Sequence, residues 1–197
     1  MLTDENELIS QTDNGLISEG NSGTFAELQV NITQATEGST LTLNKNYECE
    51  DGFDSGGILI NKSITIDGQG NKIDAQGKSR IFKITSENVI LKNIIFTNGK
   101  TTERGGAVYF SGTGEVTNCN FTNNKATGEY SHGGAVYFYN TGTVTNYYLS
   151  YQTVPKSRQP MVLTVHGGQN IPLTITVNIK SMQPMLDLTM SLSTMEL

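Results

Sequence analysis

Five carboxylates are the first candidates for chemistry in this 197-residue chain. A polysaccharide hydrolase needs two carboxylates on opposite sides of the scissile bond, and a lyase needs a base, usually with Ca²⁺ held by carboxylates. No two of the five recur at a spacing that would stack them on one face. Asp67 and Asp74 bracket a glycine-rich turn, so we interpret them as turn residues and predict no catalytic residue in the chain. The five are Asp67, Asp74, Glu87, Glu115 and Glu129.

The histidines and cysteines do not form a recognisable reactive or metal-binding set. His132 precedes a Gly-Gly turn, where we expect it to be exposed, and His166 lies in a segment of different composition. Cys49 and Cys119 lack metal-ligand spacing, so we interpret them as small interior residues. A disulfide and an exposed reactive thiol are the alternatives. We predict no metal ion and no cofactor.

The composition is that of an uncharged polar chain, with 36% hydrophobic and 16% charged residues and a net charge of −6. Because there is no Lys/Arg cluster, this balance argues against a nucleic-acid partner. No stretch is long enough to span a bilayer, so we predict no membrane insertion of this chain. Residues 1–7 are acidic, so we expect no signal peptide in the chain as given.

The candidate residues named above are positioned by a part of the chain that contains repeated segments. The segment 105–110 (GGAVYF) returns unchanged 28 residues later, and so does 116–118 (VTN). A weaker copy relates 93–98 to the segment 25 residues later. Such a period predicts a solenoid, whose turns bury their apolar faces only by stacking on one another. The residues expected to carry the repeat are Asn93, Phe96, Gly105, Gly106, Asn118, Phe121, Gly133, Gly134 and Asn146.

Short strand signals separated by turn residues run through the repeat region. No segment between them is long enough for a crossover helix, which excludes alternating strand–helix units and leaves a solenoid made of strands alone. We therefore predict an all-β fold of four to five coils. The expected strands are 39–43, 57–60, 63–66, 81–84, 89–91, 94–96, 107–110, 116–121, 135–139 and 143–145.

One amphipathic helix is expected just before the first strand, over residues 24–35. Thr24 is a plausible N-cap, and Glu27 completes a capping box. The apolar residues share one face at helical spacing, and they are Phe25, Leu28, Ile32 and Ala35. We predict that this helix covers the open end of the solenoid.

Three repeated residue types have more than one interpretation. The Gly-Gly pairs resemble phosphate loops, but a phosphate loop needs a helix behind it, and strand residues follow here. We therefore assign the glycines to positive φ or to close approach of coils.

The repeated asparagines are expected to form a hydrogen-bonded ladder, with glycan or metal binding as the alternative. Tyr137 and Tyr139 share a face that could stack on sugars, whereas the alternative stacks Tyr137 on Tyr109.

The chain divides into three parts. Residues 1–22 are polar and acidic and are expected to form a flexible leader, and residues 23–146 form the repeat domain. All four prolines, five of the six methionines and only two of the 21 glycines lie beyond Asn146. Proline cannot donate into a central ladder, so we interpret 147–197 as an anomalous, poorly ordered tail that is read in a displaced frame. Sequencing the gene tests this interpretation, because the displaced frame should encode further Asn-rich repeats.

The repeats resemble those of two families of surface proteins. The segments GGAV and FTNN are similar to the GGA[ILV] and FxxN repeats of the chlamydial polymorphic outer-membrane proteins. The order of 118–124 (NCNFTNN) and 133–135 (GGA) looks closer to the large adhesin-like surface proteins of methanogenic archaea, as do 59–71 and 80–82 (RIF). The resemblance covers about 23–146. It implies a right-handed parallel β-helix of the pectate-lyase-like type, exposed outside the cell.

The resemblance also implies a function. It predicts a non-catalytic, adhesin-like module, extracellular or at the cell surface, that contacts cells, matrix, surface glycans or partner-cell proteins. A polysaccharide lyase or glycoside hydrolase on the same fold is one alternative. Members of these families are much longer and carry an export signal and an anchor, and we expect neither in the chain as given. A truncated or frameshifted, non-functional gene fragment is therefore the other alternative.

Overall fold

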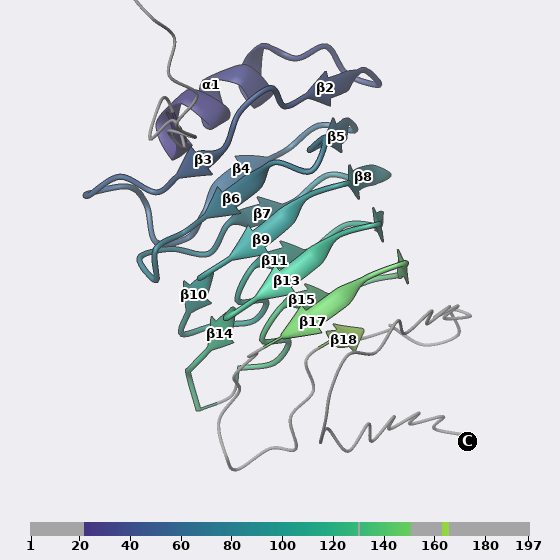
Figure 1. Cartoon of the computed structure of the whole chain (residues 1–197). Helices are drawn as coiled ribbons and strands as arrows, with labels where there is room; N and C mark the ends of the chain where they lie inside the picture. Colours follow the sequence, from purple (N-terminus) through teal and green to yellow (C-terminus); the bar gives the residue numbers. More distant parts are fainter. Residues whose placement is uncertain (1–21, 130, 151–162, 166–197) are drawn as a thin grey trace, which may run out of the picture.

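The computed structural model describes residues 22–129, 131–150 and 163–165. In this part the chain forms a parallel β-helix of about five turns, with one helix at its N-terminal end (Figure 1). Successive turns lie one below the other, and every strand pairs in parallel with the equivalent strand of the next turn. The predicted β-solenoid with an N-terminal helix is confirmed.

Three parallel sheets run along the solenoid, here named sheets A, B and C. Sheet A contains β1 (Gly23–Thr24), β3 (Tyr47–Glu48), β6 (Lys72–Asp74), β9 (Ile95–Thr97), β13 (Asn120–Thr122) and β17 (Tyr148–Ser150). Sheet B contains β2 (Thr40–Thr42), β5 (Thr65–Asp67), β8 (Val89–Lys92), β12 (Gly114–Thr117) and β16 (Gly142–Thr145). Sheet C contains β4 (Ile58–Ile60), β7 (Phe82–Ile84), β11 (Val108–Phe110), β15 (Val136–Phe138) and β18 (Leu163–Val165). A further pair joins β10 (Lys100–Thr101) to β14 (Lys125–Ala126).

Stacked phenylalanines fill the interior of the solenoid. Phe96 and Phe121 lie in register on β9 and β13, and their rings stack with centroids 5.0 Å apart. Phe110 and Phe138 stack in the same way on β11 and β15, at 4.4 Å. All four side chains are fully buried, and burying each stabilises the fold by about 1.5–3 kcal/mol. The 25- and 28-residue periods therefore place identical rings on adjacent turns.

The Gly-Gly pairs are explained by backbone geometry. Gly105 has φ +69° and Gly133 has φ +65°, conformations that other residues rarely adopt. A Cβ on Gly106 would collide with the backbone oxygen of Gly134 and with the backbone of Lys125. The N–H of Gly106 donates to the Gly133 carbonyl at 2.9 Å, so the two pairs lie on adjacent turns. Strands β11 and β15 follow them, as expected for a structural role.

The helix α1 (Phe25–Gln34) closes the N-terminal end and buries Phe25, Leu28 and Ile32, as predicted. Thr24 Oγ1 accepts from the N–H of Glu27 at 3.1 Å. The expected capping box is only half formed, because the Glu27 carboxylate pairs with Lys45 at 2.7 Å instead.

Residues of the first turn hold both ends of α1. The carboxylate of Glu50 accepts from the N–H groups of Phe25 and Ala26, at 2.9 and 3.0 Å. At the other end, Lys62 Nζ donates to the carbonyls of Thr33 and Ala35, at 2.7 and 2.9 Å. A negative group at the N-terminus and a positive group at the C-terminus both complement the helix dipole.

The strand ladder continues beyond Asn146, the residue at which the sequence predicts the repeat domain to end. Strand β17 pairs with β13, and β18 pairs with β15, both in parallel. Residues 147–150 therefore complete a turn of sheet A, because Tyr148 and Leu149 take the register positions of Asn120 and Phe121. The predicted leader up to residue 21, and the tail at 151–162 and 166–197, lie outside the described residues.

Candidate functional site

Two columns of asparagine amides flank sheet A. The first lies at the turn from sheet B, where Asn93, Asn118 and Asn146 all have positive φ, at +56°, +51° and +49°. Asn118 Nδ2 donates to Asn93 Oδ1 at 2.6 Å, and Asn93 Nδ2 donates to Asp67 Oδ1 at 2.9 Å. The repeated asparagines thus lie at one corner of successive turns, and the hydrogen bonds between Asn118, Asn93 and Asp67 make the corner rigid.

A second amide column, which the sequence analysis did not identify, lies at the opposite margin of sheet A. Asn123 Nδ2 donates to Asn98 Oδ1 at 2.7 Å, and Asn98 Nδ2 donates to Asp74 Oδ1 at 2.8 Å. Both asparagines have φ +55°. The available signal was the spacing of 25 residues between the Thr-Asn pairs that end at Asn98 and Asn123.

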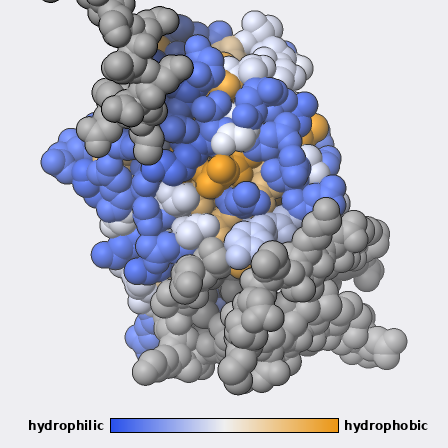
Figure 2. Space-filling model, viewed as in Figure 1, coloured by the Kyte–Doolittle hydropathy of each residue, from blue (hydrophilic) through white to orange (hydrophobic). Residues whose placement is uncertain are grey.

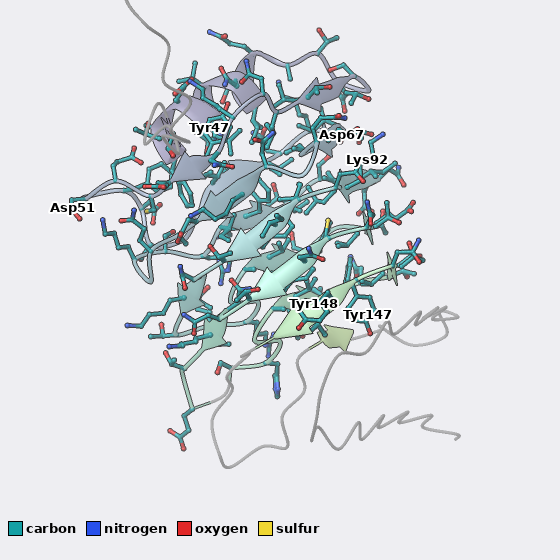
Figure 3. The ribbon with its side chains drawn as sticks, viewed as in Figure 1. Tyr47, Asp51, Asp67, Lys92, Tyr147 and Tyr148 are labelled. Carbon is teal, nitrogen blue, oxygen red and sulfur yellow. The ribbon has the colours of Figure 1, made fainter. Side chains whose placement is uncertain are left out.

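Asp67 and Asp74 each end one column and are occupied by structural hydrogen bonds. Burial alone would raise the pKa of Asp67, but hydrogen bonds from Asn93 and the Gln69 N–H, together with Lys92 at 3.2 Å, hold that pKa below its ordinary value. In Asp74 burial is likewise outweighed, and its pKa is also lowered. Figure 3 shows Asp67 and Lys92 close together at one margin of the solenoid. Both carboxylates act as turn residues.

This arrangement predicts acid sensitivity. Because the folded-state pKa values of Asp67 and Asp74 are depressed, the stability they contribute is present above their unfolded pKa of about 3.9 and is lost as pH falls through the lower folded values. We expect the free energy of unfolding, measured by denaturant titration, to fall between about pH 4 and pH 3. The double variant Asp67→Asn/Asp74→Asn should fall less over this interval.

Asp51→Asn is the matched control for acid sensitivity. Asp51 pairs with Lys78 at 2.8 Å, but its side chain is 96% exposed, so solvent screens the pair. The slope of stability against pH should hardly change in this variant. An equal flattening in the control and in the double variant would contradict the assignment.

A groove of about 340 Å³ lies at the margin of sheet A, between the first amide column and the strands β9 and β13. Figure 2 shows the same face with an apolar patch near its middle, surrounded by hydrophilic residues. Ile95 points outward from β9 and is half-buried, while Gln69, Asn118 and Asn120 are exposed. The residues lining the groove are Gln69, Gly70, Asn93, Ile94, Ile95, Asn118 and Asn120.

Tyr148 lies beyond the groove, on the same outward row of sheet A toward the C-terminal end. It is the register partner of Asn120 on the next turn, and its side chain is 46% exposed on the face seen in Figure 3. The outward column Lys72, Ile95, Asn120 and Tyr148 therefore runs along the solenoid axis on sheet A. The result is an apolar floor with amides along one side and an aromatic ring at one end.

The connection from sheet A to sheet C varies in length along the solenoid. In residue numbers it runs from 48 to 58, from 74 to 82, from 97 to 108 and from 122 to 136, so the difference is 10, 8, 11 and 14. The connection from sheet B to sheet A varies less: its difference is 5 from 67 to 72, and 3 from 92 to 95, from 117 to 120 and from 145 to 148. Length variation in a solenoid concentrates where loops leave the repeat, often on a binding face.

The long connections enclose a second hollow of about 400 Å³. It is lined by Thr102, Glu103, Arg104, Tyr109 and Glu129. Of the five predicted carboxylates, only Glu129 lines it, and its neighbour Glu103 was not singled out from the sequence. Glu87 instead accepts from the Thr113 N–H at 2.9 Å, and Glu115 lies on sheet B in register with Ile90 and Thr143. Of the five candidate carboxylates, this hollow thus contains one and the groove on sheet A contains none.

The tyrosines on sheet C stack between turns. The rings of Tyr109 and Tyr137 lie 5.7 Å apart and nearly parallel, at 7°. The guanidinium of Arg80 lies 5.4 Å from the Tyr109 ring centroid, and that of Arg104 lies 5.2 Å from the Tyr137 centroid. The stacking of Tyr137 on Tyr109 is therefore the interpretation that the structure bears out, and Tyr109 is committed to neighbours within the protein.

The predicted interior position of both cysteines is confirmed. Cys49 and Cys119 are free thiols and are buried. Burial raises the pKa of Cys49 to about 11 and that of Cys119 to about 12, so neither is a thiolate near neutral pH. His132 is half-buried and stacks on Tyr137 at 6.4 Å, which corrects its expected exposure. Within the described ranges, no group of three or more His, Cys, Asp or Glu side chains could hold a metal ion.

Comparison with protein-family models, with curated proteins and with solved structures finds no match to this chain. Among the residues that the structure describes, no helix has the length and apolar character needed to cross a membrane.

Proposed function

We propose that this chain is a non-catalytic, adhesin-like β-helix module that works outside the cell or at its surface and contacts glycans or partner-cell proteins. The observation that carries this proposal is the groove on sheet A, whose floor is Ile95 and whose rim is Gln69, Asn118 and Asn120. Amide side chains both donate and accept hydrogen bonds, so such a rim suits a polar, uncharged contact. A concave surface with an apolar base and a few polar groups is the usual form of a binding site.

The fixed position of Asn118 on the rim favours a role in ligand binding over a purely structural role. Asn118 is fixed through Asn93 to Asp67 by two hydrogen bonds, so its position is set before any ligand arrives. A preorganised group loses less conformational entropy on binding than a mobile one. The opposite margin is held in the same way by the column that ends at Asp74.

If the chain were a polysaccharide lyase or hydrolase, the second hollow would be the candidate active site. Glu103 and Glu129 both line the second hollow, and two carboxylates across a bond are what hydrolysis requires. Glu103 already accepts from Arg80 at 3.0 Å, however, and its side chain is 74% exposed. An exposed carboxylate that is already paired with a guanidinium is a poor candidate for the proton donor of a hydrolase.

One experiment tests both functions with the full chain. We expect the immobilised protein to retain a subset of polysaccharides or cells and to release neither reducing nor unsaturated ends from the polysaccharides, including polyuronides. The measurements are retention on the surface and assays of released ends. Release that disappears in Glu103→Gln, Glu129→Gln, Asp67→Asn or Asp74→Asn would replace the binding function with the enzymatic one.

A further inference from the structure

We propose that the groove on sheet A binds uncharged sugar residues, in a chain that lies along the solenoid axis between Gln69 and Tyr148. This inference rests on the proposed binding function and narrows its ligand to a chemical class. It is carried by three features of the groove, namely its charge, its open hydrogen-bonding groups and its periodicity.

The groove offers no net charge to a ligand. All seven residues that line it are uncharged. Lys72, on the same outward row as Ile95, is already paired with Asp74 at 3.2 Å, and Lys92 is paired with Asp67 at 3.2 Å. An acidic sugar would have to be desolvated without a counter-charge, which is unfavourable, whereas a neutral sugar would meet no such penalty.

The rim retains hydrogen-bonding capacity for a ligand. Among the described residues, the Asn120 side chain lies outward on β13, exposed, and takes no part in the amide columns. The Gln69 side chain is also exposed at the other end of the groove, while its backbone N–H is held by Asp67 at 3.1 Å. Carboxamides can pair with sugar hydroxyl groups as donors and as acceptors. Between them, the half-buried side chain of Ile95 supplies an apolar surface for the C–H face of a sugar ring.

The spacing of these groups favours an extended ligand. Equivalent residues on neighbouring turns are one strand apart, about 4.8 Å, so Ile95, Asn120 and Tyr148 form a regular row along the axis. Tyr148 is 46% exposed, and its aromatic ring can pack against the apolar face of a further sugar residue while its hydroxyl stays in water. The row therefore presents successive contacts in the direction in which a linear oligosaccharide extends.

Titration calorimetry on the full chain tests the inference, with cello-oligosaccharides and manno-oligosaccharides as neutral probes and galacturonate oligosaccharides of equal length as acidic ones. We expect a neutral probe to bind and an acidic one to bind at least about tenfold more weakly, a difference of about 1.4 kcal/mol. Asn120→Ala and Tyr148→Ala should each weaken the neutral interaction by about tenfold or more. Thr143→Ala, an outward position on sheet B, is the matched control and should leave it unchanged.

The outcomes separate this inference from the function on which it rests. Preferred binding of galacturonate, or neutral binding that is unaffected in both groove variants at an unchanged melting temperature, overturns the inference. If no oligosaccharide binds but the chain still adheres to cells, the inference fails and the binding function stands. If the chain binds neither probes nor cells, both fail.

Discussion

Replacing Arg80 with alanine should lower the free energy of unfolding by about 3–5 kcal/mol, because three backbone carbonyls lose a buried, charged hydrogen-bond donor. The Arg80 side chain is only 1% exposed. Its guanidinium group donates to the carbonyls of Gly56, Arg104 and Gly105 at 3.1, 2.9 and 3.0 Å. Truncation leaves these acceptors without their donor inside the protein, and each unsatisfied buried group costs about 1–3 kcal/mol. Denaturant unfolding followed by circular dichroism measures the loss.

Two further variants show which interaction of Arg80 matters. Glu103→Gln removes its carboxylate partner, but that side chain is 74% exposed, so the change should cost no more than about 1 kcal/mol. Arg80→Lys keeps the positive charge and loses the planar fork, so it should retain only part of the stability. A loss in Glu103→Gln as large as that in Arg80→Ala would assign the stabilisation to the ion pair instead of to the three carbonyls.

Leu28→Asp should detach the capping helix and cause the protein to aggregate. Leu28 is fully buried under α1, so the substitution forfeits about 1.5–3 kcal/mol of burial and places a carboxylate in an apolar site. When the helix leaves, the N–H and C=O groups of Leu59 lose their bonds to Gln29, at 2.7 and 3.0 Å. An unpaired strand edge then becomes available for association with other chains.

The same helix supplies the control. Val30 lies on the outer side of α1 and is 51% exposed, so Val30→Asp adds an identical charge without disturbing the cap. Thermal melting and light scattering should distinguish the two variants clearly. Equal solubility and equal melting temperatures for Leu28→Asp and Val30→Asp would show that the helix does not protect the end of the solenoid.

The sequence was sufficient to predict the solenoid because its repeats encode stacking directly. Identical residues at a fixed spacing must occupy equivalent positions on adjacent turns, and the buried phenylalanines do so at β9 and β13. Strand boundaries were harder to predict. The segment 116–121 reads as one strand, yet the structure divides it into β12 and β13 because Asn118 adopts φ +51° and turns the chain. Positive φ at asparagine competes with strand propensity, and local pattern alone does not decide between them.

The candidate site was only partly predictable for a similar reason. The carboxylates could be assigned to turns because Asp67 and Asp74 flank glycine-rich sequence. The groove could not be predicted, because its lining comes from three turns, and its floor, Ile95, looks like an ordinary strand residue. The structural role of Arg80 could not be predicted either. Its partners at Gly56 and Gly105 are backbone carbonyls 24 and 25 residues away. Because every residue type has a backbone carbonyl, the sequence does not indicate which ones accept a hydrogen bond from Arg80.

The direction of the amide columns determines how such a solenoid can lengthen. In each column the side chain of a later turn donates to the turn before it, and the series begins at a carboxylate, Asp67 or Asp74, that can only accept. A turn inserted ahead of these residues, with its amide oriented as in the existing columns, would set an amide oxygen against a carboxylate. A turn added after the last asparagine repeats an existing bond. Gene duplication therefore extends the columns without reorienting any amide when the new turn lies on the side away from the helix. The identical segments 105–110 and 133–138 are the product expected from such growth.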